Sequence, residues 1–230
     1  MARPATSDDV KLRRSLVLAL LCCLAVSSLA FAEGMDWQVE STKRGITVSS
    51  RPDGGGRLSA FRGEGVVEGN VLQLLAVILD VREIERWAYG VSWARSLAEH
   101  HPQGDLVHLY SDTPWPLSDR DMVVRRDFEV LSPGRKFAIS VRCEPNAAPE
   151  KAGVIRVREC ESRFVLERVN EHQSRVVYES RLEPAGVLPR WASDWVAKNA
   201  PFQTLVALEG RAKRTVGRYA SVMKRWQSVL

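Results

Sequence analysis

The stretch that decides the fold covers residues 112–130 and reads DTPWPLSDRDMVVRRDFEV. Its second half alternates between two faces, as an extended strand does, because successive side chains of a strand point in opposite directions. One face carries the apolar side chains of Met122, Val124, Phe128 and Val130. Arg126 interrupts this face, and since a guanidinium keeps its charge, a buried Arg126 needs an anionic or polar partner.

An apolar wall with one fixed polar group is typical of a site for an amphipathic small molecule. The alternative is an arginine near the end of a strand, whose charged head reaches water while its stem covers apolar surface. The alternation alone leaves both interpretations open.

The first 32 residues are predicted to be a cleaved signal peptide and not part of the fold. Lys11, Arg13 and Arg14 form a basic segment, residues 15–29 are almost uncharged and apolar, and residues 30–32 read AFA, a small-x-small cleavage site. The apolar run is short for a membrane span, although an uncleaved anchor is the alternative. The pattern predicts an exported protein, periplasmic or secreted, and leaves open whether the general or the twin-arginine route is used.

Removing the signal peptide leaves residues 33–230, enough for one substantial core in a single domain. The net charge of the whole chain is +5, which is mildly basic and does not indicate nucleic-acid binding. Transient contact with an anionic membrane surface is compatible with this charge, as is an ordinary solvated surface. We expect a monomer.

Two cysteines remain after cleavage, Cys143 and Cys160. Simple hairpin register around a turn near Pro149 would place Cys143 opposite Val154 or Ile155. We therefore expect buried free thiols, although an exported protein can oxidise such a pair to a disulfide.

The pattern along the chain predicts an α+β protein with an antiparallel sheet. Strands are expected at 37–40, 46–50, 57–67, 91–98, 104–111, 120–131, 135–144, 154–168 and 174–183, with a bulge near 159–162 where the apolar parity shifts. Short helices are expected at 71–79, capped by Asn70, and at 81–87. Residues 189–199 and 202–226 are predicted to be helical on either side of Pro201, and the second of these helices is amphipathic.

This order of elements, together with PLSDRDMV at 116–123 and GVLPRW at 186–191, resembles the START family, the steroidogenic-acute-regulatory-related lipid-transfer domains. The segment PEKAGVIR at 149–156 adds to the likeness, which covers about residue 37 to the C-terminus. The resemblance implies a helix-grip fold, in which a curved antiparallel sheet wraps a long C-terminal helix and encloses an apolar tunnel for one lipid. It also implies that the last helix and the loop at 144–153 gate the tunnel.

The resemblance bears on Arg126 as well. Some sterol-binding members of the family carry a cavity-facing arginine six residues after the arginine of the Arg-Asp pair, and six residues after Arg120 is Arg126. The acidic partner often found on the neighbouring strand is not evident, so His108 or Tyr110 is expected to replace it. The predicted ligand-binding residues are Arg126, His108, Tyr110, Met122, Val124, Phe128, Phe137, Ile139, Tyr178, Trp191, Trp195, Phe202 and Leu205.

Signals for catalysis are weak. The sequence has no nucleophile elbow, phosphate loop or dinucleotide fingerprint, and the adjacent pair His100-His101 lacks the spacing of a metal site. We therefore expect no cofactor, no metal and no enzyme, but a carrier of one hydrophobic ligand: a lipid, sterol-like or isoprenoid compound. Helix-grip folds also host cyclases and hydrolases that act on aromatic or polyketide-like substrates, which is the alternative; a third is an interaction module with a filled cavity.

Overall fold

The computed structural model describes residues 37–52, 59–101, 104–113, 115–183, 185–186 and 189–227. The signal peptide predicted at residues 1–32 lies outside these residues. Residues 36–230 form one compact unit. Among the helices in the described part of the chain, none is both long enough and apolar enough to cross a membrane.

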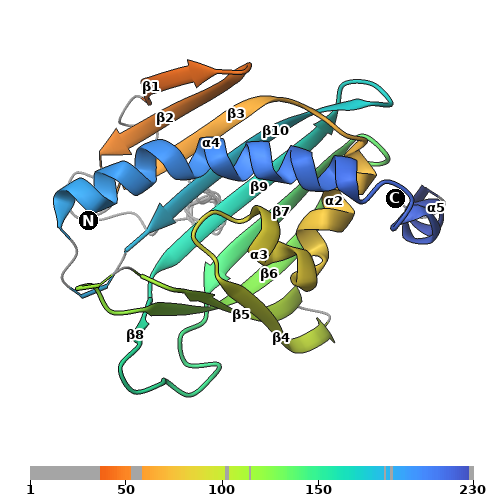
Figure 1. Ribbon diagram of the computed structural model, residues 1–230. Coiled ribbons are helices and arrows are strands. Elements are labelled where there is room, and N and C mark those ends of the chain that lie inside the picture. The colour runs from red at the N-terminus through yellow and green to blue at the C-terminus, as the bar shows by residue number, and fades with distance from the viewer. Residues whose placement is uncertain are drawn as a thin grey trace, which may run out of the picture. The chain divides into compact units, whose positions relative to one another are not determined.

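The described strands form a single ten-stranded sheet (Figure 1). Its spatial order is β1-β2-β3-β10-β9-β7-β6-β5-β4, and every pair in this order is antiparallel; β8 lies off this path and pairs parallel with β6. The strands are β1 (Gln38–Lys43), β2 (Ile46–Pro52), β3 (Ser59–Glu68), β4 (Trp93–His101), β5 (Gly104–Ser111), β6 (Arg120–Ser132), β7 (Lys136–Cys143), β8 (Ile155–Arg156), β9 (Cys160–Arg168) and β10 (Gln173–Leu182).

Three helical segments between β3 and β4 follow the prediction closely. Helix α2 (Val71–Leu79) begins at Asn70, whose side-chain oxygen accepts a hydrogen bond from the backbone N–H of Leu72 at 2.9 Å. The short helix predicted at 81–87 is a 3₁₀ turn, η1 (Val81–Glu83), that continues into α3 (Ile84–Trp87). Because eight of the nine residues of α2 are buried, this helix forms part of the core and does not lie on the surface.

The long helix α4 (Arg190–Arg214) lies across one face of the sheet (Figure 1), so the predicted fold class, a curved antiparallel sheet gripping a C-terminal helix, is confirmed. The predicted break at Pro201 is wrong, since Pro201 lies inside α4. The helix ends instead at Arg214, where the Thr215 hydroxyl bonds to the carbonyls of Arg211 and Ala212; a second helix, α5 (Ala220–Gln227), follows. Helix propensities along the sequence did not reveal this end of the helix. It depends on a side-chain hydroxyl that competes with backbone N–H groups for those carbonyls.

The face of the sheet beneath α4 is here called the inner face. Gly63 on β3 belongs to this face, because a methyl group added at Gly63 would point toward α4. It would lie 2.9 Å from the Pro201 side chain and 3.3 Å from that of Leu205. Since directly paired residues of antiparallel strands point to the same face, the register carries this assignment from Gly63 to Tyr178, Phe164 and onward across the sheet.

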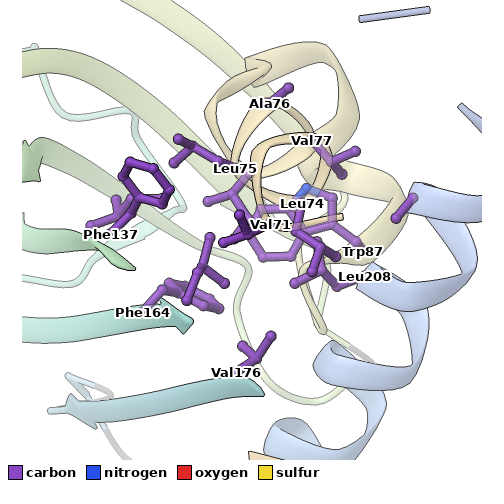
Figure 2. Packing of buried hydrophobic residues seen from close by; sticks show 14 of the residues in the cluster. Val71, Leu74, Leu75, Ala76, Val77, Trp87, Phe137, Phe164, Val176 and Leu208 are labelled. Carbon is purple, nitrogen blue, oxygen red and sulfur yellow. The ribbon is translucent and has the colours of Figure 1, made fainter. Parts of the chain in front are cut away.

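The core occupies the part of the inner face covered by α2 and the C-terminal part of α4. Figure 2 shows Leu74 and Leu75 of α2 pointing toward side chains of the sheet, with Trp87 and Leu208 close by. The most deeply buried members are fully inaccessible: Leu74, Leu75, Phe137, Ile139, Leu166, Val176, Leu205 and Leu208. At about 1.5–3 kcal/mol for each large apolar side chain that is buried, this cluster is the main source of stability.

Cys143 and Cys160 form a disulfide with a Cα–Cα separation of 5.1 Å, so the expectation of free thiols is wrong. The expected register failed because β8 pairs with β6 and not with β7. The chain then passes through residues 157–159 before β9 begins, and the β7–β9 register, in which Val141 faces Ser162, brings the two cysteines opposite each other. The prediction of one strand at 154–168 with a bulge near 159–162 is therefore wrong: β8 and β9 are separate strands with different partners, and the chain leaves the sheet between them.

Candidate functional site

The solvent accessibility of the inner-face side chains changes along the strands. Toward α2 its side chains are fully buried, whereas toward the opposite end, where β7 ends and β9 begins, apolar inner-face side chains keep part of their surface accessible. These partly accessible side chains are Leu109, Met122, Val141, Cys143, Cys160 and Tyr178. We call this region the open end of the inner face, and it is the candidate site because a ligand can contact only surface that the protein does not itself cover.

The N-terminal half of α4 covers the open end. We call this half of the helix the roof, and the inner-face side chains of the sheet beneath it the floor. Ala197 and Ala200 pack against Phe61 of β3, and Phe202 is partly buried against the main core. Trp195 is 54% exposed, and its ring lies 5.9 Å from that of Tyr89, which follows α3. Roof and floor are therefore both built mainly from apolar and aromatic groups, as in pockets for hydrophobic molecules.

A cluster of hydroxyl groups lies on the floor of the open end. Ser162 and Ser180 face each other across β9 and β10, and their hydroxyl oxygens are 2.7 Å apart. Tyr178, two residues before Ser180, points to the same face as both serines and stacks on Phe164 at 4.3 Å between ring centroids. Burial raises the pKa of Tyr178 more than the neighbouring serine hydroxyls lower it, so the phenol stays neutral at physiological pH.

Of this hydroxyl cluster, only Tyr178 was predicted as a ligand-binding residue. Ser162 and Ser180 were missed, because a serine in a strand carries no signal by itself. The two become a pair only through the β9–β10 register, which the sequence pattern alone did not resolve across the break after β8.

Arg126 is buried on the inner face, as predicted, but its hydrogen bonds go to other parts of the protein and not toward a ligand site. Its Nε donates to Asp105 at 2.9 Å, and its Nη2 donates to the same carboxylate. Nη1 and Nη2 also donate to the carbonyls of Ile78 and Leu79, at 2.8 and 2.9 Å, at the end of α2. Four of its five N–H donors are thus used within the protein, and they satisfy helix-terminal carbonyls that would otherwise lack partners.

The expectation that His108 or Tyr110 replaces the acidic partner of Arg126 is wrong. Asp105 is that partner, directly opposite Arg126 in the β5–β6 register. His108 and Tyr110 alternate with the inner-face residues of β5 and so lie on the other face of the sheet, here called the outer face. The sequence offered Asp105 at the start of a predicted strand, where its pairing partner could not be assigned without the register.

On the outer face, His108 belongs to a charged network. Its Nε2 lies 2.8 Å from Asp121, and Arg156 donates to both oxygens of that carboxylate at 2.8 and 2.9 Å. Burial by itself would raise the pKa of Asp121, but the hydrogen bonds from Arg156 and His108 outweigh it and lower the pKa below its ordinary value. Tyr110 donates to Asp119 at 2.8 Å. The network joins β5, β6 and β8.

Arg156 also fastens the loop at 144–153, which was expected to be a mobile gate. Its guanidinium donates to the backbone carbonyls of Pro145, Ala148 and Pro149. Because its side chain is only 1% exposed, these bonds lie away from water, and solvent cannot readily compete for them. The loop is therefore anchored at several points along its length.

Eight of the other predicted ligand-binding residues divide into two groups, and Phe128 and Trp191 belong to neither. Met122, Tyr178, Trp195 and Phe202 lie at the open end or in its roof, whereas Val124, Phe137, Ile139 and Leu205 are packed into the core at 2% exposure or less. Phe128 is 40% exposed near the far end of β6 and stacks on Phe137. Trp191 lies in the first turn of α4, and its side chain is outside the described part of the structure.

Comparison with known proteins shows one family and several relatives. The sequence model of the START domain matches residues 21–208. An uncharacterised protein of Pseudomonas aeruginosa, PA1579, is 27% identical over 191 residues, which cover 82% of this chain and 92% of that protein. The phosphatidylcholine transfer protein of Rattus norvegicus is 32% identical over 173 residues, which cover 72% of this chain and 78% of that protein.

A solved structure extends the comparison to three dimensions. The crystal structure of a fragment of a STAR-related lipid transfer protein from Xanthomonas axonopodis superposes with a TM-score of 0.70 at 25% identity. The match covers 77% of this chain and 98% of that fragment.

Proposed function

Because the chain belongs to the START domain family, we propose that it binds a single hydrophobic molecule between the open end of the inner face and the N-terminal half of α4, and carries it through water. The observation that carries this proposal is the set of apolar side chains that remain partly accessible beneath α4. The ligand is a lipid, a sterol-like or an isoprenoid compound. The 32% sequence identity to the phosphatidylcholine transfer protein of Rattus norvegicus supports a lipid as the ligand.

Shielding from water supplies the binding energy. At about 25 cal/mol per Å² of apolar surface, covering a few hundred Å² of ligand contributes several kcal/mol. Since the carrier must also release its ligand, a modest and mainly apolar interaction suits transport better than a covalent or strongly charged one.

The polar end of the ligand meets the hydroxyl cluster of Tyr178, Ser162 and Ser180. Each hydroxyl group can both donate and accept, so the cluster suits an uncharged hydroxyl, carbonyl or ester group. Arg126, the anchor expected from the sequence, has one N–H left after its bonds to Asp105 and α2, so its main contribution is to hold the inner face in shape.

The N-terminal half of α4 is the gate in this proposal. The C-terminal half is fixed, because Arg211 bonds to the buried carboxylate of Glu83 and Gln73 donates to the carbonyl of Ala212. Arg218, just after the helix, bonds to the same carboxylate. Pro201 lacks the N–H that would bond to the carbonyl of Ala197, so α4 is weakest between its two halves. The loop at 144–153, held by Arg156, is the less mobile of the two expected gates.

Docking to a membrane surface would bring the gate to its source of ligand. Trp115, in the connection between β5 and β6, is 93% exposed, and this connection lies at the same end of the sheet as the disulfide and the start of α4. Tryptophan is the residue that partitions best into the membrane interface. Trp115→Ala should reduce co-sedimentation with vesicles of mixed phosphatidylglycerol and phosphatidylcholine; unchanged co-sedimentation would remove Trp115 from the docking surface.

Export through a signal peptide at residues 1–32 belongs to the proposal too. The disulfide supports it, because disulfides persist mainly in oxidising compartments outside the cytosol. N-terminal sequencing of the protein from its native host tests the prediction, and a mature chain that starts at residue 1 would refute it.

The rival proposal, a cyclase or hydrolase, needs an acid or base that titrates inside the site. In the hydroxyl cluster that group is Tyr178, and a raised pKa keeps its proton in place. Neutral hydroxyls of this kind favour binding over proton abstraction.

The test is to identify what the protein holds. Native mass spectrometry of the purified protein, followed by extraction with chloroform and methanol, should release one class of lipid in up to equimolar amount. The matched control is the double variant Met122→Trp with Val141→Trp, which fills the open end; if it folds and retains the same lipid, the ligand lies elsewhere. Wild-type protein that neither contains nor takes up lipid from vesicles refutes the proposal.

A further inference from the structure

The disulfide between Cys143 and Cys160 stands at a junction in the sheet. It joins the last residue of β7 to the first residue of β9, and β8 takes the place beside β6 that β7 has just left. The bond therefore closes the segment 144–159, which contains the loop fastened by Arg156.

The same disulfide forms part of the floor of the open end. Cys143 faces Val124 in the β6–β7 register and so points to the inner face, and Cys160 faces Leu182 of β10. Both cysteines pack against the apolar core as partly buried residues. Breaking this bond would thus affect both the loop and the proposed ligand site.

A surface groove of about 270 Å³ reaches the disulfide from outside. It is lined by Arg142, Cys143, Arg158, Glu159, Cys160, Glu161 and Arg181. Arg142 and Arg158 are each more than half exposed while paired with Asp127 and Glu150. A disulfide whose two cysteines line a surface groove is more accessible to an external thiolate than a disulfide sealed in the core.

Guanidinium groups lie beside both cysteines in the groove. Arg142, Arg158 and Arg181 line it together with Glu159 and Glu161, and Arg142 and Arg158 are also paired with Asp127 and Glu150. A guanidinium near a sulfur stabilises a thiolate, which is both the leaving group and the product of thiol–disulfide exchange.

We propose that Cys143–Cys160 is a reversible redox site, reduced and re-oxidised by a dithiol partner of the Cys-x-x-Cys oxidoreductase class, and that its reduction loosens the segment 144–159. In the first step a thiolate of the partner attacks one sulfur and forms a mixed disulfide, while the other cysteine leaves as a thiolate. The second thiol of the partner, as its thiolate, then attacks the mixed disulfide and releases the remaining cysteine. Two electrons pass to the protein, the two cysteine thiolates take up two protons, and the partner becomes a disulfide.

The consequence for ligand exchange rests on the function proposed above. With the bond intact, the ends of β7 and β9 are held together beneath the ligand. Without it, the ends of β7 and β9 keep their backbone pairing in the β7–β9 and β9–β10 ladders but lose the covalent link between them. The reduced protein should therefore open and exchange its ligand faster than the oxidised protein.

The first experiment asks whether the site is reducible in the folded protein. The full chain is titrated with dithiothreitol in native buffer, the free thiols are labelled with a maleimide, and the products are counted by intact mass while circular dichroism monitors the fold. We expect two labels per chain with an unchanged circular dichroism spectrum, and faster hydrogen–deuterium exchange confined to peptides from 144–159. Labelling that requires denaturant, or exchange in 144–159 that is unchanged by reduction, overturns the proposal.

The second experiment measures transfer of NBD-labelled phosphatidylcholine between vesicles by the oxidised and reduced protein. We expect transfer to be about tenfold faster after reduction, a factor that corresponds to about 1.4 kcal/mol. The double variant Cys143→Ala with Cys160→Ala should transfer at the fast rate and ignore dithiothreitol; equal rates for oxidised and reduced wild type refute the effect on ligand exchange. If neither form transfers or takes up lipid, the proposed function fails, while the thiol counts and hydrogen exchange still decide whether the redox site exists.

Discussion

Replacing Arg126 with leucine distinguishes two roles for this side chain, ligand anchor and structural clamp. An anchor that binds only the ligand would leave the free energy of unfolding nearly unchanged when removed. A clamp between β5, β6 and the end of α2 would not. The contacts of Arg126 with Asp105, Ile78 and Leu79 indicate the clamp.

The expected magnitude follows from the bonds that are lost. The Arg126 side chain is 5% exposed and that of Asp105 is 25% exposed, so the pair is buried on one side and partly hydrated on the other. Removing one member of a buried ion pair costs about 3–5 kcal/mol, and partial hydration of Asp105 places this case near 3 kcal/mol. For a chain of this size, that loss corresponds to a decrease in melting temperature of about 6–12 °C.

The assay is urea unfolding followed by tryptophan fluorescence and circular dichroism, on wild type and Arg126→Leu. Arg125→Leu is the matched control, because Arg125 is the next residue on the same strand but points to the outer face and pairs with the partly exposed Glu144 at 3.2 Å. Such a surface pair contributes about 0–1 kcal/mol. A loss within that range of about 0–1 kcal/mol for Arg126→Leu, together with weaker lipid capture, would refute the clamp and restore the anchor.

Three other variants test the site and the network behind it. Ser162→Ala combined with Ser180→Ala should weaken capture of a hydroxylated lipid about tenfold, the effect of one lost hydrogen bond, while Ser140→Ala on the outer face should not; equal losses would remove the hydroxyl cluster from the site. Pro201→Ala supplies the missing N–H in α4 and should slow lipid transfer between vesicles without changing how much lipid is bound, whereas an unchanged rate would argue against a hinge there. Asp121 has a lowered pKa, so its contribution to stability is complete above the ordinary carboxyl pKa and is lost as the pH falls through the lowered value; Asp121→Asn should therefore destabilise the protein at pH 7 and flatten the acid side of its stability profile, and a parallel profile would contradict this assignment.

Local sequence patterns were sufficient to predict most of the helices and strands. The alternation at 120–131, the apolar stripe at 71–79 and the cap at Asn70 act through neighbours in the chain, so their effects can be read without knowing the rest of the fold. The same alternation placed Arg126 on the buried face. The order of these elements, with the motifs at 116–123 and 186–191, was sufficient for the family.

The contents of the site depended on contacts between distant residues. Asp105 meets Arg126, Ser162 meets Ser180, and Cys143 meets Cys160 only because particular strands are paired in a particular register. A two-residue strand, β8, that pairs with β6 shifts the start of β9 and so decides the last of these pairings. No local preference encodes such a register, since it is set by which arrangement buries the whole apolar face at once; tertiary packing therefore decided which polar groups face the proposed ligand and which hold the protein together.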